Sequence, residues 1–389
     1  MKTQVMTLNV GPQHPATHGV LRVKIDLDGE TIIKAEPIVG YLHTGIEKNM
    51  EAKKYNQANT MTDRMDYLAP MSNNLVYVLV VEKLLGVDIP LRAQYIRVIM
   101  TELTRLNSHL VWLGTHATDI GAMTMLLYTF REREKILKMY EMVSGVRMMS
   151  TYFRIGGLAQ DVPAGFDKRV KEILDTFPSK IDEYEGLLTE NQIWKNRTIG
   201  IGKVSAEAAI RAGLSGPLLR GSGVNWDIRK ANPYSSYDKF DFNVPLGKNG
   251  DTYDRYKCRV EEMRQSLRII RQALDGLPDG PFITTDRKIA PPPKAEVLKN
   301  MEQLIHHFKY WTEGIKVPEG DAYVSIESPK GEIGCYVVSD GSPNPYRVHF
   351  RPPSFVNISA LNLLAKGHMI ADLIAIIGTT DIVLGEVDR

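Results

Sequence analysis

Residues 20–27, near the N-terminus, alternate strictly between apolar and charged side chains from Leu21 onward. In residues 20–27, three charged positions alternate with four apolar ones, Leu21, Val23, Ile25 and Leu27. A period of two is typical of a strand with one buried face. Asp28-Gly29 supplies a turn, and residues 31–36 return as a second strand. We therefore predict a β-hairpin in this region.

After Pro37 the apolar period changes to three and four residues. This spacing runs from Gly45 to about Gly86 and again from Pro90 to Gly145. It predicts long helices, and the clearest apolar stripe consists of Ile96, Ile99, Met100, Leu103, Leu106, Leu110 and Leu113. These faces are too apolar to stand alone, so we expect the helices to pack as a bundle. Further helices are predicted at 167–186, 253–274 and from the prolines at 291–293 to about Trp311.

The last part of the chain returns to short strands. Residues 322–326, 333–338 and 346–350 alternate in character and are separated by turn-forming segments. They predict an antiparallel meander. A final helix is predicted from about Ile358 to Gly378, before a tail that ends at Arg389.

The order β, long helices, β, helix predicts an α+β protein rather than a string of separable modules. We divide it into an N-terminal β region with a loop at 1–40, a helical bundle core at 41–315 and a C-terminal region at 316–389. The last region holds the meander, the final helix and a buried tail. All three are expected to form one integrated domain.

The composition is that of an ordinary globular protein. Of 389 residues, 43% are hydrophobic and 24% charged, and 48 basic residues nearly balance 46 acidic ones. Such a balance gives no field that would attract nucleic acid. The longest apolar run, residues 75–81, is too short to cross a bilayer. Residues 1–5 show no signal-peptide pattern.

Only two cysteines are present, Cys258 and Cys335. They form neither a Cys-x-x-Cys pair nor a disulfide framework. We expect a reducing compartment, with both thiols acting as small packing residues.

The loop from Gly11 to Gly19 contains two prolines and two histidines, His14 and His18. Histidines four residues apart suit metal binding on a helix, but prolines prevent a helix here and no thiolate lies nearby. A rigid loop can instead present imidazoles as proton or hydrogen-bond donors. The histidines could equally satisfy the loop's own backbone. The residues alone leave both roles open.

Three charged motifs lie among the apolar helices: residues 42–48 with Glu51 and Lys53, residues 63–67, and Asp119. Taken singly, each has a structural interpretation. Glu47 and Glu51 would charge the first turns of a helix. Residues 63–67 would form a solvated turn. Asp119 would cap the turn after its helix or pair with a histidine.

The loop from Gly11 to Gly19, residues 42–48 with Glu51 and Lys53, and residues 63–67 together resemble the D subunit of complex I, which is the hydrogenase-like component of NADH–quinone oxidoreductases. The resemblance continues in order through residues 154–157, 221–227, 250–256, 329–332, 339–341 and 381–389. It implies a fold like that of the nickel–iron hydrogenase large subunit. In that fold a central long-helix bundle is flanked by an N-terminal sheet and a C-terminal antiparallel β region.

The resemblance also implies a site where quinone is reduced to quinol, formed together with the B subunit of the complex. That neighbour would hold the terminal iron–sulfur cluster, and this chain would bind no cofactor or metal. Tyr67 and His18 are expected to bind the quinone headgroup and donate protons, since quinol formation needs two protons as well as two electrons. Asp119 is expected to pair with His18 and raise its pKa. The remaining site residues would be His14, Arg64, Asp66, Asp381 and Val383.

Further partners implied are the C and I subunits of the peripheral arm and the membrane-embedded H subunit at the quinone tunnel. The chain would lie on the cytoplasmic face of the bacterial inner membrane. Discharge of the His18–Asp119 pair on quinone reduction would trigger proton translocation in membrane subunits. The electron donor depends on the partner subunits, and neither the quinone species nor the pumping stoichiometry follows from this chain.

Hydrogenases of the related family end in Asp-Pro-Cys-x-x-Cys-x-x-His, but here Val383 and Glu386 occupy the thiolate positions. Residues 63–67 also contain no cysteine. Because nickel and iron need soft thiolates in this setting, we expect no metal centre. The alternatives are a metal-dependent hydrogenase and an assembly scaffold in which Tyr67 is structural. One departure from many family members is Met149, where a histidine near the cluster is frequent.

Overall fold

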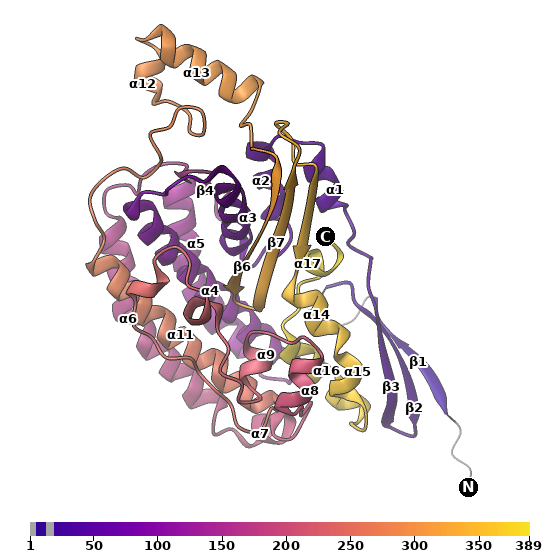
Figure 1. Ribbon diagram of the computed structural model, residues 1–389. Helices are drawn as coiled ribbons and strands as arrows, with labels where there is room; N and C mark the ends of the chain where they lie inside the picture. The colour runs from indigo at the N-terminus through magenta and orange to yellow at the C-terminus, as the bar shows by residue number, and fades with distance from the viewer. Residues whose placement is uncertain (1–4, 13–18) are drawn as a thin grey trace.

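A computed structural model describes residues 5–12 and 19–389. Long helices form the main body, and a three-stranded sheet stands at one edge beside the C-terminal helices (Figure 1). Its strands pair antiparallel in the order β1-β2-β3 and span Met6–Val10, Arg22–Asp28 and Thr31–Ile38. The predicted hairpin is confirmed, and β1 adds a strand that was not predicted. The apolar residues of β2 are buried against the C-terminal helices.

The core of the body is helical, as predicted. Its long helices are α3 Pro70–Leu85, α4 Leu91–Asp119, α5 Thr124–Ser144, α6 Phe166–Leu188 and α11 Thr252–Asp275. The helix α4 is central and packs against α5, α11 and the C-terminal helix α16 (Ile370–Thr380). Its predicted apolar stripe is fully buried. The bundle prediction is therefore confirmed.

The predicted helical stretch from Gly45 to Gly86 is helical and is divided into three helices. They are α1 Ile46–Glu51, α2 Tyr55–Thr62 and α3. The chain turns between α2 and α3 through residues 63–69. This turn carries the charged motif, and its charged side chains are the physical reason for the break in the apolar pattern.

Short elements cover the body between α6 and α11 and beside α3. The small strands β4 Phe153–Arg154 and β5 Gly157–Leu158 pair antiparallel. The others are α7 Gln192–Thr198, α8 Ala206–Arg211, α9 Pro217–Arg220, α10 Ile228–Ala231 and the 3₁₀ helix η1 Tyr237–Lys239.

The predicted C-terminal meander is confirmed. Its strands are β6 Gly320–Ser328, β7 Gly331–Ser339 and β8 Arg347–Arg351, paired antiparallel in that order. The sheet packs against α3. Together the sheets and the helical core make an α+β fold, while the division at residues 40 and 315 stays a prediction.

The single helix predicted from Ile358 to Gly378 is wrong. The chain forms α14 Pro353–Ser359, α15 Leu361–Ala365, α16 Ile370–Thr380 and α17 Leu384–Asp388. The break after Ala365 is a non-local effect. The Ile32 amide of β3 donates to the His368 carbonyl at 2.9 Å, and the Gly367 amide donates to the Ile32 carbonyl at 2.8 Å. The edge strand thus takes the hydrogen bonds that a continuous helix would have used.

Two further helices, α12 Lys294–Val297 and α13 Met301–Thr312, stand apart from the body at the top of Figure 1. They replace the single helix predicted to end near Trp311. Among the described residues, no helix has both the length and the apolar character needed to cross a membrane.

Candidate functional site

The turn between α2 and α3 places Tyr67 beside the central helix α4. The Asn107 side chain donates from α4 to the Leu68 carbonyl at 3.2 Å, and the Asn73 side chain donates from α3 to the Asp66 carbonyl at 3.2 Å. Within this turn Arg64 is exposed, Asp66 buried and Tyr67 partly buried. The two asparagines therefore fix which side chains of the motif face the interior.

Asp66 forms a buried ion pair with Lys330, which lies in the turn between β6 and β7. The Lys330 Nζ atom is 3.0 Å from Asp66 Oδ2 and donates to Ser108 Oγ at 2.8 Å. Burial lowers the pKa of Lys330, but Asp381, Asp66 and Glu386 raise it, and the net effect is a pKa above the usual value. Lys330 is thus a permanent positive charge with carboxylates around it.

The C-terminal tail packs directly onto the same turn. A Cβ atom at Gly385 would lie 2.7 Å from the Met65 carbonyl oxygen and 3.0 Å from that of Arg64, so only glycine fits. A Cβ atom at Gly19 would lie 3.5 Å from Leu384 Cδ1. The tail therefore contacts both residues 63–67 and Gly19 at the end of the N-terminal loop. These three segments lie far apart in sequence.

The 42–48 motif holds this tail in place. Asp388 accepts hydrogen bonds from the Gly40 and Leu42 amides, both at 2.7 Å. Arg389 Nε lies 2.8 Å from Glu47 Oε1, which also accepts from the Phe350 amide at 2.8 Å. Glu47 therefore anchors the C-terminus and β8. The prediction that Glu47 charges the first turn of a helix did not include these contacts with the C-terminus and β8.

Glu386 and Val383, at the two expected thiolate positions, are both buried. The Ser354 hydroxyl donates to Glu386. Burial and the neighbouring charge of Asp66 raise the pKa of Glu386 to about 8. Glu386 therefore carries a proton near neutral pH, and Val383 adds apolar surface.

This protonation gives a pH prediction for Glu386→Gln. The folded pKa of about 8 exceeds the ordinary value of 4.5, so the folded chain binds the proton more tightly. This contribution to stability is fully present below about pH 4.5 and is lost as the pH rises through about 8. Gln resembles the protonated acid and cannot ionise. Between pH 5 and 8 the Tm of the wild type should therefore fall by several degrees more than that of the variant, measured by thermal unfolding. Parallel curves would contradict a protonated Glu386.

Tyr67 keeps its proton in this environment. Burial raises the pKa of its phenol, Asp66 raises it further, and Lys330 lowers it in part. Nearby, burial raises the pKa of Asp63 to about 6, and Asp63 accepts a hydrogen bond from the Thr151 amide at 2.9 Å. The motif thus combines a neutral phenol with two buried carboxyl groups, Asp63 and Asp66.

Asp381 lies at the end of α16 with a left-handed φ of 50°. Its carboxylate is 3.9 Å from Arg259 Nε. The Arg259 guanidinium lies over the Trp112 ring, 4.3 Å from its centroid. Asp381 is buried and, through Lys330, belongs to the same charged cluster as Asp66.

Asp119 is the last residue of α4 and is partly exposed. It lies eleven residues beyond Ser108, which corresponds to about 16 Å along the helix axis. A site that includes both Asp119 and the Lys330 cluster would therefore have them at opposite ends. His14 and His18 lie outside the described residues, so the expected His18–Asp119 pair stays a prediction.

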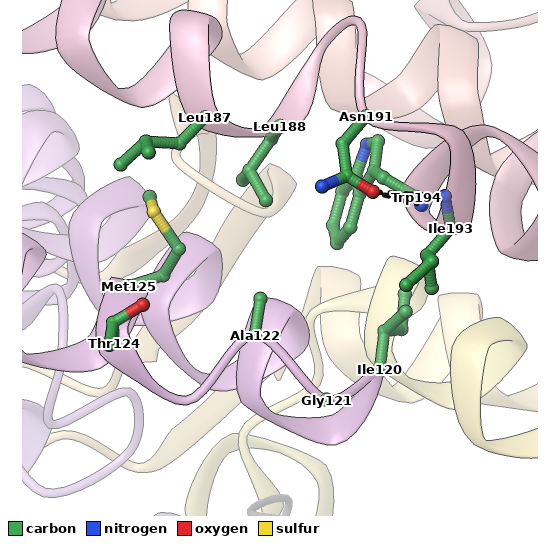
Figure 2. Close-up of a pocket in the computed structure, with 10 residues that line it drawn as sticks. All are labelled: Ile120, Gly121, Ala122, Thr124, Met125, Leu187, Leu188, Asn191, Ile193 and Trp194. Atoms are coloured by element: carbon green, nitrogen blue, oxygen red, sulfur yellow. Dashed lines mark hydrogen bonds between the residues drawn. The ribbon is translucent and has the colours of Figure 1, made fainter.

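A pocket opens immediately beyond Asp119, between the α4–α5 turn and the α6–α7 connection (Figure 2). It encloses about 350 Å³ and is lined by Ile120, Gly121, Ala122, Thr124, Met125, Leu187, Leu188, Asn191, Ile193 and Trp194. Close to it in sequence, Met123 and Leu127 are 71% and 72% exposed. Sequence reasoning missed this surface, although the apolar run after Asp119 was a usable signal.

A buried charge network fixes the position of the Lys330 turn. Arg220 lies 2.6 Å from both Glu262 and Glu327. Arg105 of α4 donates to the Ser328 carbonyl at 3.1 Å, next to the Lys330 turn. Its other members are Glu102, His109, Asp227 and Arg229. Sequence reasoning missed this network, because charged residues in a helix pattern normally indicate solvent.

These features define an α+β protein with a helical core, whose candidate site combines a neutral phenol with a buried cluster of charged groups. Among the described residues, no group of three or more His, Cys, Asp or Glu side chains is arranged to hold a metal ion.

The family model of the respiratory-chain NADH dehydrogenase 49 kDa subunit matches residues 119–389. The NADH-quinone oxidoreductase D subunit of Geotalea uraniireducens is 63% identical over 387 residues, covering 100% of this chain and 99% of the relative. The D subunit of Geobacter sulfurreducens is 61% identical over 387 residues, covering 100% and 99%. That of Citrifermentans bemidjiense is 61% identical over 389 residues, covering 100% of both chains.

The chain therefore belongs to the 49 kDa family, the D subunits of NADH-quinone oxidoreductase, respiratory complex I. It is one component of a respiratory oxidoreductase, and the other subunits of that complex are its partners.

Proposed function

We propose that this chain, together with the B subunit of the complex, forms the site where quinone is reduced to quinol. The observation that supports this best is the position of Tyr67. Its partly buried phenol keeps its proton beside the buried Asp66–Lys330 pair. The terminal iron–sulfur cluster of the B subunit would supply the electrons, and this chain would supply protons and hydrogen bonds.

The chemistry of Tyr67 suits a proton donor that acts only on the reduced ligand. Reduction of quinone by two electrons creates two basic oxygens, and two protons convert them to hydroxyls. A phenol with a raised pKa does not ionise in the resting site, but it can protonate such an oxygen. The resulting phenolate would be stabilised by the charge of Lys330, which already lowers the pKa of Tyr67.

His18 is proposed to donate the second proton, with Asp119 as its charge partner. Ser108 and Asp119 lie about 16 Å apart along α4, so His18 would have to reach from the Asp119 end to the headgroup carbonyl opposite Tyr67. Gly19, next to His18 in sequence, adjoins Leu384 of the tail. Because the tail also packs on the 63–67 turn, this contact supports a loop that reaches the same site as Tyr67.

The other residues would shape the wall of the site. Asp66 and Asp381 keep Lys330 charged, and Arg64 and His14 would face the ligand or the B subunit. Val383 supplies buried apolar surface, and the exposed Met123 and Leu127 offer an apolar surface beside Asp119. Apolar walls suit a quinone, whose ring and tail are largely apolar.

We further propose that the chain lies at the membrane without entering it, on the cytoplasmic face of the bacterial inner membrane. The C and I subunits would complete the peripheral arm, and the membrane-embedded H subunit would meet it at the quinone tunnel. Loss of protons from Tyr67 and His18 would change the local charge and so trigger proton translocation in membrane subunits.

Locating quinone in the assembled enzyme tests the proposal. A headgroup in contact with Tyr67 would support it. A headgroup seated where no atom of this chain's 63–67 turn is within reach would overturn it and leave an assembly role for Tyr67.

A further inference from the structure

The helix α13 exposes its apolar side chains and turns its other side toward the body of the protein. Its apolar side chains recur at helical spacing on one stripe, Met301, Leu304, Ile305, Phe308 and Trp311, and all five are exposed. Met301 is 71% exposed and Phe308 64%. Tyr310, on the opposite side of the helix, is the buried residue of α13. The stripe therefore points away from the body.

The helix is attached to the body at its C-terminal end. Lys54 donates to the Trp311 carbonyl at 3.2 Å, and Tyr310 packs near Asn56 and Arg154. In Figure 1, α12 and α13 extend from this root away from the other helices. A helix of 12 residues is marginal in water without packing on its apolar face. The helix would therefore be stabilised by another surface that covers its apolar stripe.

We propose that α13 is a docking helix that inserts its apolar stripe into a groove on another subunit of the same oxidoreductase. Helices bind grooves through anchors spaced three, four and seven residues apart, which is the spacing of Met301, Leu304, Ile305 and Phe308. The proposal rests on membership of a multi-subunit complex and not on the proposed quinone site.

Charge argues against a lipid surface as the occupant. Helices that lie on membranes carry an excess of lysine and arginine along their polar face. Residues 294–313 contain three lysines and three glutamates. The segment of α12 and α13 therefore has no net attraction to anionic lipids, and a protein groove without strong net charge fits it better.

Area argues against a second copy of this chain. The stripe offers roughly 500 Å² of apolar surface. A self-paired α13 would stay below the roughly 800 Å² per partner of a standard stable interface. A groove on a different subunit can gain more, because it can enclose both sides of the stripe and also cover a hollow of about 170 Å³ where α13 joins the body. Its lining includes Trp311, Tyr310, Pro291 and Arg154, so a bound groove could continue from the stripe into this hollow.

The test is photo-crosslinking in the purified, assembled oxidoreductase. A photoreactive phenylalanine analogue at position 308 should give an adduct between this chain and another subunit, identified by mass spectrometry. The same analogue at Glu302, which is 77% exposed and lies off the stripe, should give an adduct yield on the order of tenfold lower. Adducts only with lipid, with a second copy or with this chain's own body would overturn the proposal, as would the absence of adducts.

A pair of variants checks the same inference by assembly. Ile305→Lys with Phe308→Lys should reduce the other subunits recovered with this chain on the order of tenfold, since a groove would bury unpaired charges. Glu302→Lys changes the charge at a side chain that is 77% exposed and lies off the stripe, and it should assemble normally. The Tm of the isolated double variant should match the wild type, because the stripe lies outside the body. Normal assembly of the double variant would contradict a docking helix.

Discussion

Replacing Tyr67 by Phe is expected to lower the quinone-reductase turnover of the assembled enzyme roughly 100-fold or more, which is the usual contribution of a positioned proton donor. Phe keeps the ring and its packing in the turn, so the chain should fold and assemble. Only the hydroxyl is lost. Electron input should be unchanged, which NADH oxidation with an artificial acceptor upstream of quinone would show.

Tyr346→Phe is the matched control. Its side chain is 68% exposed and lies on the connection between β7 and β8. The same loss of a hydroxyl there should leave turnover unchanged. If Tyr67→Phe retained the turnover of this control, the role of Tyr67 as a proton donor would be wrong.

Lys330→Met is expected to give the largest loss of stability. Lys330 is fully buried, and Met would leave Asp66 without its ion pair in the interior. Removing one member of a buried pair costs about 3–5 kcal/mol, and here Asp381 also loses a neutralising charge. The free energy of unfolding, from denaturant titration of the isolated chain, measures the effect.

Lys48→Met provides the comparison, since the Lys48 side chain is 85% exposed and pairs with Glu51 at 2.6 Å. Exposed pairs contribute about 1 kcal/mol or less. Adding Asp66→Asn to Lys330→Met should recover part of the lost stability, because it removes the uncompensated charge. Equal effects of the two lysine variants would show that the Lys330 cluster is not a buried ion pair.

Local periodicity predicted the elements whose partners are close in sequence. The β2–β3 hairpin and the α4 stripe both follow from repeating apolar positions. The break between α15 and α16 did not, because it depends on hydrogen bonds between His368 and Ile32 of a distant strand. Gly367, with a left-handed φ of 85°, is a local signal for the end of α15, but the pairing with β3 cannot be read from residues 366–369.

The residues of the candidate site also fall into those that the sequence indicated and those that only the fold reveals. The charged 63–67 motif was visible because it interrupts apolar helices, but its roles came from family resemblance. Lys330 was passed over, since a lysine beside a glycine in a turn normally indicates solvent, and only the fold shows it buried against Asp66. The same holds for Arg220 and Glu262, whose pairing joins α9 to α11.

The central claim is that the phenol of Tyr67 contacts the quinone that the complex reduces. The most direct measurement is the distance from the Tyr67 hydroxyl to the nearest quinone oxygen in a structure of the assembled enzyme with bound quinone. We predict hydrogen-bond contact, roughly 2.6–3.2 Å. A fully inserted headgroup whose oxygens all lie beyond the reach of Tyr67, even through one water molecule, would contradict the account.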